Sequence, residues 1–417
     1  MLFSRFSKLT LATLAASVAV VTAVSAQTKA PPATPAAPAA APGAPPAAAP
    51  AGPPPILAFE EALTRAATNL LTNAKIPAQT GKIPLVIDPL IDGVSGIQSS
   101  ATRYMETRLR EIVRKDHPKF ELLPFTAASI DRQPVVMVGT FTAVNNAGQA
   151  QGARDAYRIC FALADLKSKT IVGKAATRAN PEGVRHIPTA FFNETPVMGK
   201  DESTEAYVKT CQASQLAAAI DSTYVARVKT AALVSDAIGA YEGGKYREAL
   251  DLYTKAKAGD GGTQLRVYNG VYLTNWRLGR RKAASEAFAE MVDYGLKNNQ
   301  LNVRFLFKPG STSFIGDRRI RSQYPTWLAR LALAAEKNKS CLETIGHASR
   351  TGPEPVNVRL SKLRADSIRT GLVGYAKGVE KRVIANGAGS SQALIGTGKD
   401  DASDALDRRV EFKQINC

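Results

Sequence analysis

The chain has 417 residues, with 45% hydrophobic and 22% charged side chains and a formal net charge of +18. This charge favours an anionic partner. Nucleic acid is not expected as that partner, because no basic and aromatic recognition pattern occurs in the sequence.

An export signal is predicted for residues 1–26. Arg5 and Lys8 precede an apolar run, which ends in small residues that suit signal-peptidase cleavage before Gln27. No Cys follows the run, so a lipoprotein anchor is not expected, and no later stretch is apolar over the length of a transmembrane segment. We therefore expect the mature chain in the periplasm, and leave open its association with the outer membrane or cell wall.

Residues 27–55 are predicted to be a disordered linker, since 11 of the 24 prolines lie between Ala30 and Pro55. Pro and Ala bury almost nothing and φ is fixed at each Pro, so an extended spacer is expected, of up to ~80 Å at ~3.1 Å per residue. It is either a passive linker or a device that holds the folded part away from whatever retains the N-terminus.

The 362 residues after Pro55 (417 − 55) are too many for one core and indicate two or three domains. Residues 56–200 are predicted to form an α/β layer sandwich with a mainly antiparallel sheet. Helices are expected over residues 57–74 and 99–115, and a strand over residues 83–91. Further strands are expected at Phe120–Leu123, Pro134–Val144, Tyr157–Leu163 and Thr170–Ala175.

The stretch Val-Ile-Asp-Pro-Leu-Ile-Asp-Gly at residues 86–93, together with the order of these elements, resembles a small α/β domain of envelope proteins. These proteins are related to the curli secretion channel and to lipoprotein activators of murein polymerases, also called penicillin-binding-protein activators. The resemblance implies a protein-binding segment, in which Asp88 and Asp92 are strand-end and turn residues rather than catalysts.

Residues 201–298 are predicted to be helical, with a first helical stretch at 203–230. Gly244 and Gly279 are 35 residues apart, as are two further pairs of small or aromatic residues, and this spacing resembles the 34-residue tetratricopeptide repeat. About two repeats are fewer than normally stand alone, so they must pack on a neighbour. Their groove would receive a peptide or protein; alternatively, the aromatic residues only pack the repeats together, namely Tyr241, Tyr253, Tyr268, Tyr272, Trp276 and Phe288.

Residues 299–417 alternate strands and helices around one loop. A strand is expected at 303–307 and a helix from Pro325, and then a short apolar run enters the loop at residues 345–352. A helix with its apolar positions on one face follows, and strands close the segment near 382–388 and 409–415. Backbone N–H groups, a hydroxyl and a guanidinium around one strand-to-helix connection suit a carboxylate-bearing ligand.

The motif residues of this segment resemble the OmpA-like peptidoglycan-binding domain over about 110 residues. The match comprises Gly346, His347, Gly352, Asn357, Leu360, Ser361, Arg364, Ala365 and the run Asp407-Arg408-Arg409-Val410. The resemblance implies a small α/β sandwich that binds the diaminopimelate of the peptidoglycan stem peptide. It also implies a ligand-binding set of Gly346, Ser349, Thr351, Asn357, Arg364 and Arg408, in which Arg364 pairs with the ligand carboxylate and Asn357 braces the loop.

The sequence departs from the family pattern at two positions. Ser349 replaces the Asp that accepts from the ligand ammonium, and Asp407 replaces an Asn. Loss of a charge-assisted hydrogen bond worth roughly 1.5–3 kcal/mol would weaken binding about tenfold to a hundredfold. Asp366, Asp400 and Asp401 are acids that could compensate.

Four cysteines in an exported chain favour disulfides. Three connectivities are possible, and domain integrity favours Cys160–Cys211 and Cys341–Cys417.

Catalysis is not predicted, since no Gly-x-Ser-x-Gly motif, P-loop or complete dinucleotide-binding loop occurs. The isolated histidines indicate no metal site, and no cofactor is expected; His347 is interpreted as a structural residue of its motif.

The sequence thus predicts a non-enzymatic envelope scaffold or adaptor that binds peptidoglycan and presents its other segments to envelope proteins. The alternative is a protein-interaction or secretion-assembly module whose OmpA-like domain has lost its ligand.

Overall fold

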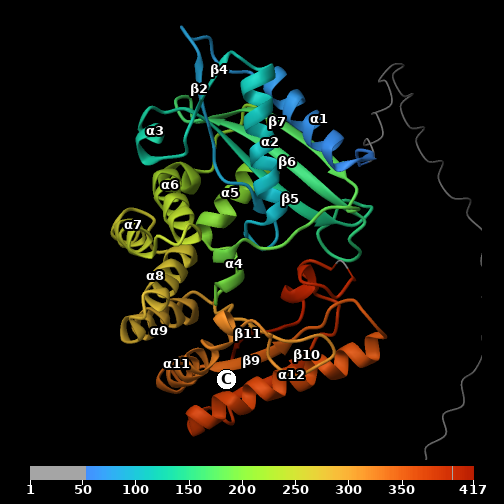
Figure 1. Cartoon of the computed structure of the whole chain (residues 1–417), viewed down its shortest axis with the longest axis vertical. Helices are drawn as coiled ribbons and strands as arrows, with labels where there is room; N and C mark the ends of the chain where they lie inside the picture. The colour runs from blue at the N-terminus through green and yellow to red at the C-terminus, as the bar shows by residue number, and fades with distance from the viewer. Residues whose placement is uncertain (1–52, 397) are drawn as a thin grey trace, which may run out of the picture. The chain divides into compact units, whose positions relative to one another are not determined.

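The computed structural model describes residues 53–396 and 398–417 (Figure 1). The predicted signal peptide and the linker up to residue 52 lie outside the described residues. The residues described from 53 onward belong to one compact unit with two β-sheets.

The N-terminal sheet has the strand order β1-β7-β6-β5-β2-β4, with β3 paired to β5. The three longest strands, β5, β6 and β7, are antiparallel neighbours, in line with the predicted antiparallel sheet. The sheet is nevertheless mixed, because β1 pairs in parallel with β7, β2 with β4 and β5, and β3 with β5. Helices connect β2 to β4 and β4 to β5, and such crossovers allow parallel pairing. The bounds are β1 (Ile56–Leu57), β2 (Ile83–Ile87), β3 (Ile91–Asp92), β4 (Phe120–Leu123), β5 (Val135–Val144), β6 (Ala156–Asp165) and β7 (Thr170–Ala179).

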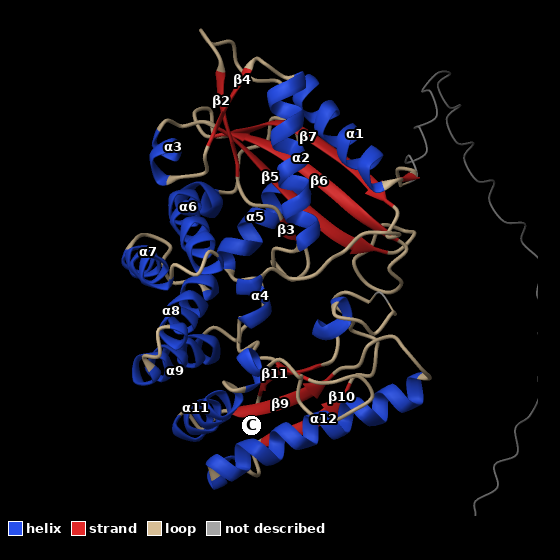
Figure 2. Ribbon diagram, viewed as in Figure 1, coloured by secondary structure: helices blue, strands red, loops and turns tan. Residues whose placement is uncertain are grey.

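Helices cover both faces of this sheet (Figure 2). Along β5, Val135 and Met137 pack with α1 and α2, whereas Val136 and Val138 pack with α5 and α6. Every residue of β5 is therefore buried, which is typical of a strand covered on both sides. The bounds are α1 (Phe59–Thr72), α2 (Ser100–Asp116), α3 (Ala127–Asp131), α4 (Ala190–Glu194), α5 (Glu202–Gln212) and α6 (Ser222–Glu242).

The helical segment contains two helix pairs, α6 with α7 (Tyr246–Ala258) and α8 (Leu265–Arg277) with α9 (Arg281–Lys297). Gly244 and Gly279 lie in the turns within the pairs at φ of 75° and 74°, a conformation that glycine adopts without strain. Their 35-residue spacing thus corresponds to two equivalent turns, while membership of the tetratricopeptide family stays a prediction.

The single helical stretch expected at residues 203–230 is wrong, because the chain leaves the helical conformation between α5 and α6. Asp221 begins α6 by accepting hydrogen bonds from the backbone N–H groups of Thr223 and Tyr224. A side chain that caps a helix in this way favours a new start over continuation of the previous helix.

The C-terminal sheet has the order β10-β9-β11-β8 and packs against α11 and α12. Its long helix α12 runs beneath β9 and β10 (Figure 1). The helix pairs join this core, because Trp327 of α11 stacks on Phe288 at 5.9 Å and donates a 2.6 Å hydrogen bond to Tyr272 Oη. The bounds are β8 (Phe305–Leu306), α10 (Arg318–Arg321), α11 (Tyr324–Lys337), β9 (Cys341–Gly346), α12 (Glu354–Tyr375), β10 (Val383–Gly387) and β11 (Arg409–Ile415).

The cysteines form one of the two predicted disulfides. Cys341–Cys417 is present and joins β9 to the last residue, but the predicted Cys160–Cys211 pairing is wrong. Both of these thiols are free and buried, and each contacts a backbone carbonyl: Cys160 Sγ lies 2.8 Å from the Cys211 oxygen, and Cys211 Sγ lies 3.9 Å from that of Val138. Buried cysteines of this kind pack as small hydrophobic side chains.

Candidate functional site

The predicted ligand-binding residues gather where β9 passes into the loop before α12. Gly346 ends β9 directly against α12, and a Cβ atom at this position would lie 1.8 Å from the carbonyl oxygen of Ser361. Only glycine fits there, so its contribution is close packing of the strand on the helix.

A buried ionic cluster lies beside this loop. Asp400 accepts a 2.7 Å hydrogen bond from Ser349 Oγ and a 2.6 Å charged hydrogen bond from Arg408. Of the three acids considered from the sequence as compensating for Ser349, the structure places Asp400 against the Ser349 hydroxyl. Fifty-one residues separate the two, so no local spacing in the sequence indicates this pairing.

Arg364 lies in the same cluster and is 1% exposed. Its three nitrogens donate to the carbonyl oxygens of Lys308, Ser311 and His347 at 2.9 to 3.0 Å. A guanidinium has five N–H donors, so these three bonds leave two donors (5 − 3). Among the described residues, no carboxylate lies within ion-pair distance of it.

The charge of Arg364 is therefore incompletely compensated. Burial and, secondarily, the neighbouring Arg408 lower its pKa to about 10, although Asp400 acts in the opposite direction. Two guanidinium groups and one carboxylate in a buried cluster favour the binding of an additional anion.

The remaining predicted residues brace the loop. Thr351 Oγ1 lies 3.3 Å from Ser349 Oγ, and the amide of Asn357 donates to the carbonyl of Gly352 at 3.5 Å. The first contact stays within the loop and the second ties the loop to the start of α12, in keeping with a positioning role.

Two further acids hold the loop that presents Asp400. Asp407 accepts from the backbone N–H groups of Leu394, Ile395 and Gly396, and Asp404 accepts from the N–H group of Asp400 itself. An Asn side chain has a single acceptor oxygen, so Asp at position 407 supplies more acceptors to this loop than an Asn would.

His347 is buried, with Nε2 3.0 Å from Glu411 Oε1. Burial and the adjacent Arg409 lower the pKa of His347. Burial alone would raise the pKa of Glu411, but Arg409 and His347 outweigh it and the pKa is lowered. The imidazole of His347 is thus enclosed by the core and lies against the Glu411 carboxylate, which is in keeping with a structural role.

The N-terminal aspartates Asp88 and Asp92 are buried and take part in hydrogen bonds within the fold. Asp88 accepts a 2.8 Å hydrogen bond from Tyr224, and Asp92 caps the turn at Val94 and Ser95. Among residues 53–396 and 398–417, no three His, Cys, Asp or Glu side chains are grouped to hold a metal ion, and no helix has the length and apolarity to span a membrane.

Several solved structures resemble part of the chain. The peptidoglycan-associated lipoprotein of Burkholderia pseudomallei is 22% identical in sequence to the matched part of this chain. The match covers 27% of this chain and 89% of the lipoprotein chain, with a TM-score of 0.23. The OmpA-like domain of FopA1 from Francisella tularensis is 20% identical over 28% of this chain and 75% of its own, with a TM-score of 0.22. An outer membrane protein of Borrelia burgdorferi B31 is 24% identical over 28% of this chain and 88% of its own, with a TM-score of 0.21. No protein-family model and no curated protein matches the chain.

Proposed function

We propose that the protein binds peptidoglycan through the cluster of Arg364, Arg408, Asp400 and Ser349. The observation that carries the proposal is the buried Arg364 guanidinium, which has two donors to spare and no carboxylate partner among the described residues. A planar guanidinium held rigidly in this way suits a ligand carboxylate.

The ligand is a stem peptide that contains diaminopimelate, whose side chain ends in an ammonium and a carboxylate. Its carboxylate pairs with Arg364, and its ammonium donates to Asp400. Asp400 thereby replaces the Asp that OmpA-like domains have at the position of Ser349. The 2.7 Å hydrogen bond from Ser349 to Asp400 supports this exchange, because it brings the carboxylate to the edge of the same loop.

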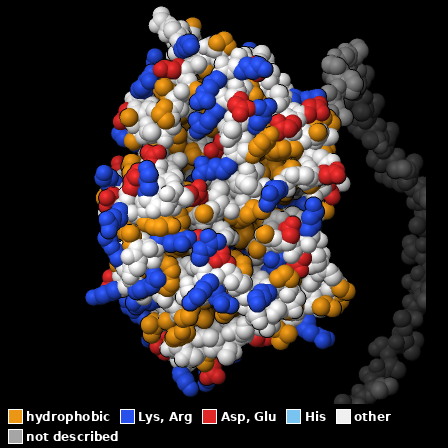
Figure 3. All heavy atoms as spheres, in the orientation of Figure 1, with side chains coloured by type: hydrophobic (Ala, Val, Ile, Leu, Met, Phe, Trp, Pro, Cys, Tyr) orange, Lys and Arg blue, Asp and Glu red, His pale blue; other side chains and the backbone are white. Residues whose placement is uncertain are grey.

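The rest of the chain serves as a non-enzymatic scaffold in the periplasm, with the helix pairs and the N-terminal sheet available to envelope proteins. Lys and Arg side chains are spread over the face shown in Figure 3, in keeping with 54 basic against 36 acidic residues. A positive surface draws the molecule towards the anionic cell wall.

A second candidate is a docking module without a ligand. It is favoured by the 1% exposure of Arg364, because a ligand carboxylate reaches this side chain only if the segment from Lys308 to Ser313 or the loop of Asp400 moves. In this case Arg364 is a brace between α12 and backbone carbonyls.

Sedimentation with purified peptidoglycan sacculi distinguishes the two, using residues 27–417. Arg364→Lys is the informative variant, because a lysine ammonium has three N–H donors, enough for the three carbonyls and none for a ligand. Arg359→Ala removes an exposed arginine from the same helix and is the matched control.

The proposal predicts that wild type and Arg359→Ala sediment with sacculi, whereas Arg364→Lys stays folded and remains in the supernatant. If wild type stays in the supernatant, the docking module is the correct description. Release of soluble fragments from the sacculi would instead show an enzyme.

A further inference from the structure

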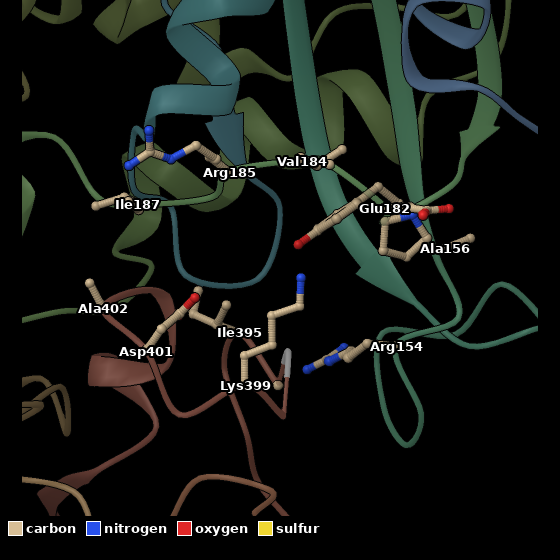
Figure 4. Close-up of a pocket in the computed structure, with 14 residues that line it drawn as sticks. Arg154, Ala156, Glu182, Val184, Arg185, Ile187, Ile395, Lys399, Asp401 and Ala402 are labelled. Atoms are coloured by element: carbon tan, nitrogen blue, oxygen red, sulfur yellow. The ribbon is translucent and has the colours of Figure 1, made fainter.

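A cavity of about 540 Å³ lies between the N-terminal sheet and the loop that carries Asp400. Arg154, Arg185 and Lys399 line it, and Figure 4 shows the side chains of Arg154 and Lys399 directed into it. Ligand-binding pockets commonly have about 300–1,000 Å³. The cavity therefore has room for a fragment of a sugar and peptide polymer.

Two hydrogen bonds connect the walls of the cavity. Arg154, which precedes β6, donates to the carbonyl of Ala393 at 2.8 Å, and Arg350 donates to the carbonyl of Gly152. Arg154 is also held by the carbonyl of Ala143 at 2.9 Å. The two segments thus form a single lined site from residues far apart in the chain.

The lining combines positive charge with apolar surface. Three cations and two acids, Glu182 and Asp401, are among the lining residues, and Ile187 and Ile395 add apolar surface. Arg185 is exposed and makes no side-chain hydrogen bond within the described part of the chain. Burial and the neighbouring Arg350 disfavour the charged form of Arg154 and lower its pKa. An anion in the cavity would favour the charged form, so the anion and the Arg154 guanidinium would stabilise each other.

The cavity adjoins the candidate peptidoglycan site through one loop. Lys399 and Asp401 line the cavity, while Asp400 between them turns to Ser349 and Arg408. On the same loop Gly396 lies against the arginines that link the two walls, since a Cβ atom there would lie 3.1 Å from Arg154 Cγ and 3.6 Å from Arg350 Nε. The cavity and the candidate peptidoglycan site therefore share this loop as a common wall.

We propose that the cavity is a second subsite, which binds a carboxylate-bearing part of the same peptidoglycan fragment whose diaminopimelate is held at Arg364. The inference rests on the proposed function. It adds that the N-terminal segment takes part in binding, so that affinity for an extended fragment exceeds affinity for diaminopimelate alone.

Calorimetric titration of residues 27–417 tests this inference with two probes, free meso-diaminopimelate and a soluble disaccharide-tetrapeptide that contains it. Arg185→Glu reverses a charge at the cavity, and Ala402→Trp fills space from an exposed position. Arg114→Glu makes the same charge change at an exposed site on α2 and serves as the control.

We expect wild type and Arg114→Glu to bind the disaccharide-tetrapeptide at least ~10-fold more tightly than diaminopimelate, since one extra ionic contact is worth about 1.4 kcal/mol or more. Arg185→Glu and Ala402→Trp should lose this gain and keep the affinity for diaminopimelate. If Arg185→Glu and Ala402→Trp both bind the disaccharide-tetrapeptide with wild-type affinity, the cavity is not a subsite. The proposed function would still stand in that case if Arg364→Lys abolishes diaminopimelate binding. Absence of wild-type binding to either probe would overturn both.

Discussion

Asp400 is the residue whose replacement tells most about the candidate site. Its carboxylate lies 2.6 Å from the Arg408 guanidinium and 2.7 Å from Ser349 Oγ, and the Arg408 and Asp400 side chains are 6% and 23% exposed. In Asp400→Asn the amide keeps the shape and removes the charge. A hydrogen bond to a charged group contributes about 1.5–3 kcal/mol, so we expect diaminopimelate binding to weaken about tenfold to a hundredfold.

The same substitution leaves Arg408 without its anionic partner, so the free energy of unfolding should fall by an amount of the same order. Urea unfolding separates this effect from binding. Asp366→Asn is the control, because Asp366 pairs with Lys362 on the exposed side of α12 and such pairs contribute at most about 1 kcal/mol.

The double variant Ser349→Asp with Asp400→Asn moves the carboxylate to the family position and should restore binding. Tighter binding by Asp400→Asn alone would show that Asp400 occupies the place of the ligand carboxylate instead of accepting from the ligand ammonium, and the assigned role of Asp400 would then be wrong.

Three further predictions concern stability. Replacing Cys341 and Cys417 by Ser opens a loop with a sequence separation of 76 and should lower the free energy of unfolding by about 4 kcal/mol in urea; no change would show that the disulfide constrains nothing. Gly346→Ala should prevent folding of the C-terminal segment, because the new Cβ would meet the Ser361 oxygen at 1.8 Å; a wild-type circular dichroism spectrum and melting temperature would contradict this. Burial raises the pKa of Asp88 from 3.8 to about 7, so from about pH 4 to 7 the folded chain keeps a proton that the unfolded chain has released. Stability should therefore fall as pH rises through this range, and Asp88→Asn should flatten the dependence; an unchanged pH profile in Asp88→Asn would contradict the assignment.

The sequence predicts the elements of this protein where a local pattern determines them. The strands at Phe120–Leu123 and Arg409–Ile415 begin and end at the predicted residues, because both stretches combine an aromatic residue with aliphatic ones in the local sequence. The turn glycines Gly244 and Gly279 are equally local, since a positive φ restricts those positions by itself.

Features that depend on residues far apart in the chain could not be predicted in this way. The pairing of Asp400 with Ser349 spans 51 residues, and the cavity joins Arg154 to a loop more than 200 residues later. The free thiols of Cys160 and Cys211 show the same limit, because an even cysteine count favours disulfides but does not establish which cysteines are bonded.

A crystal structure of residues 27–417 with a diaminopimelate-containing tripeptide would show whether Arg364 and Asp400 hold the two charged ends of diaminopimelate. We expect a ligand carboxylate about 3 Å from the Arg364 guanidinium and the ligand ammonium about 3 Å from the Asp400 carboxylate. A saturated crystal in which Arg364 is still enclosed by its three carbonyls, with no ligand beside it, would show that this binding mode is wrong.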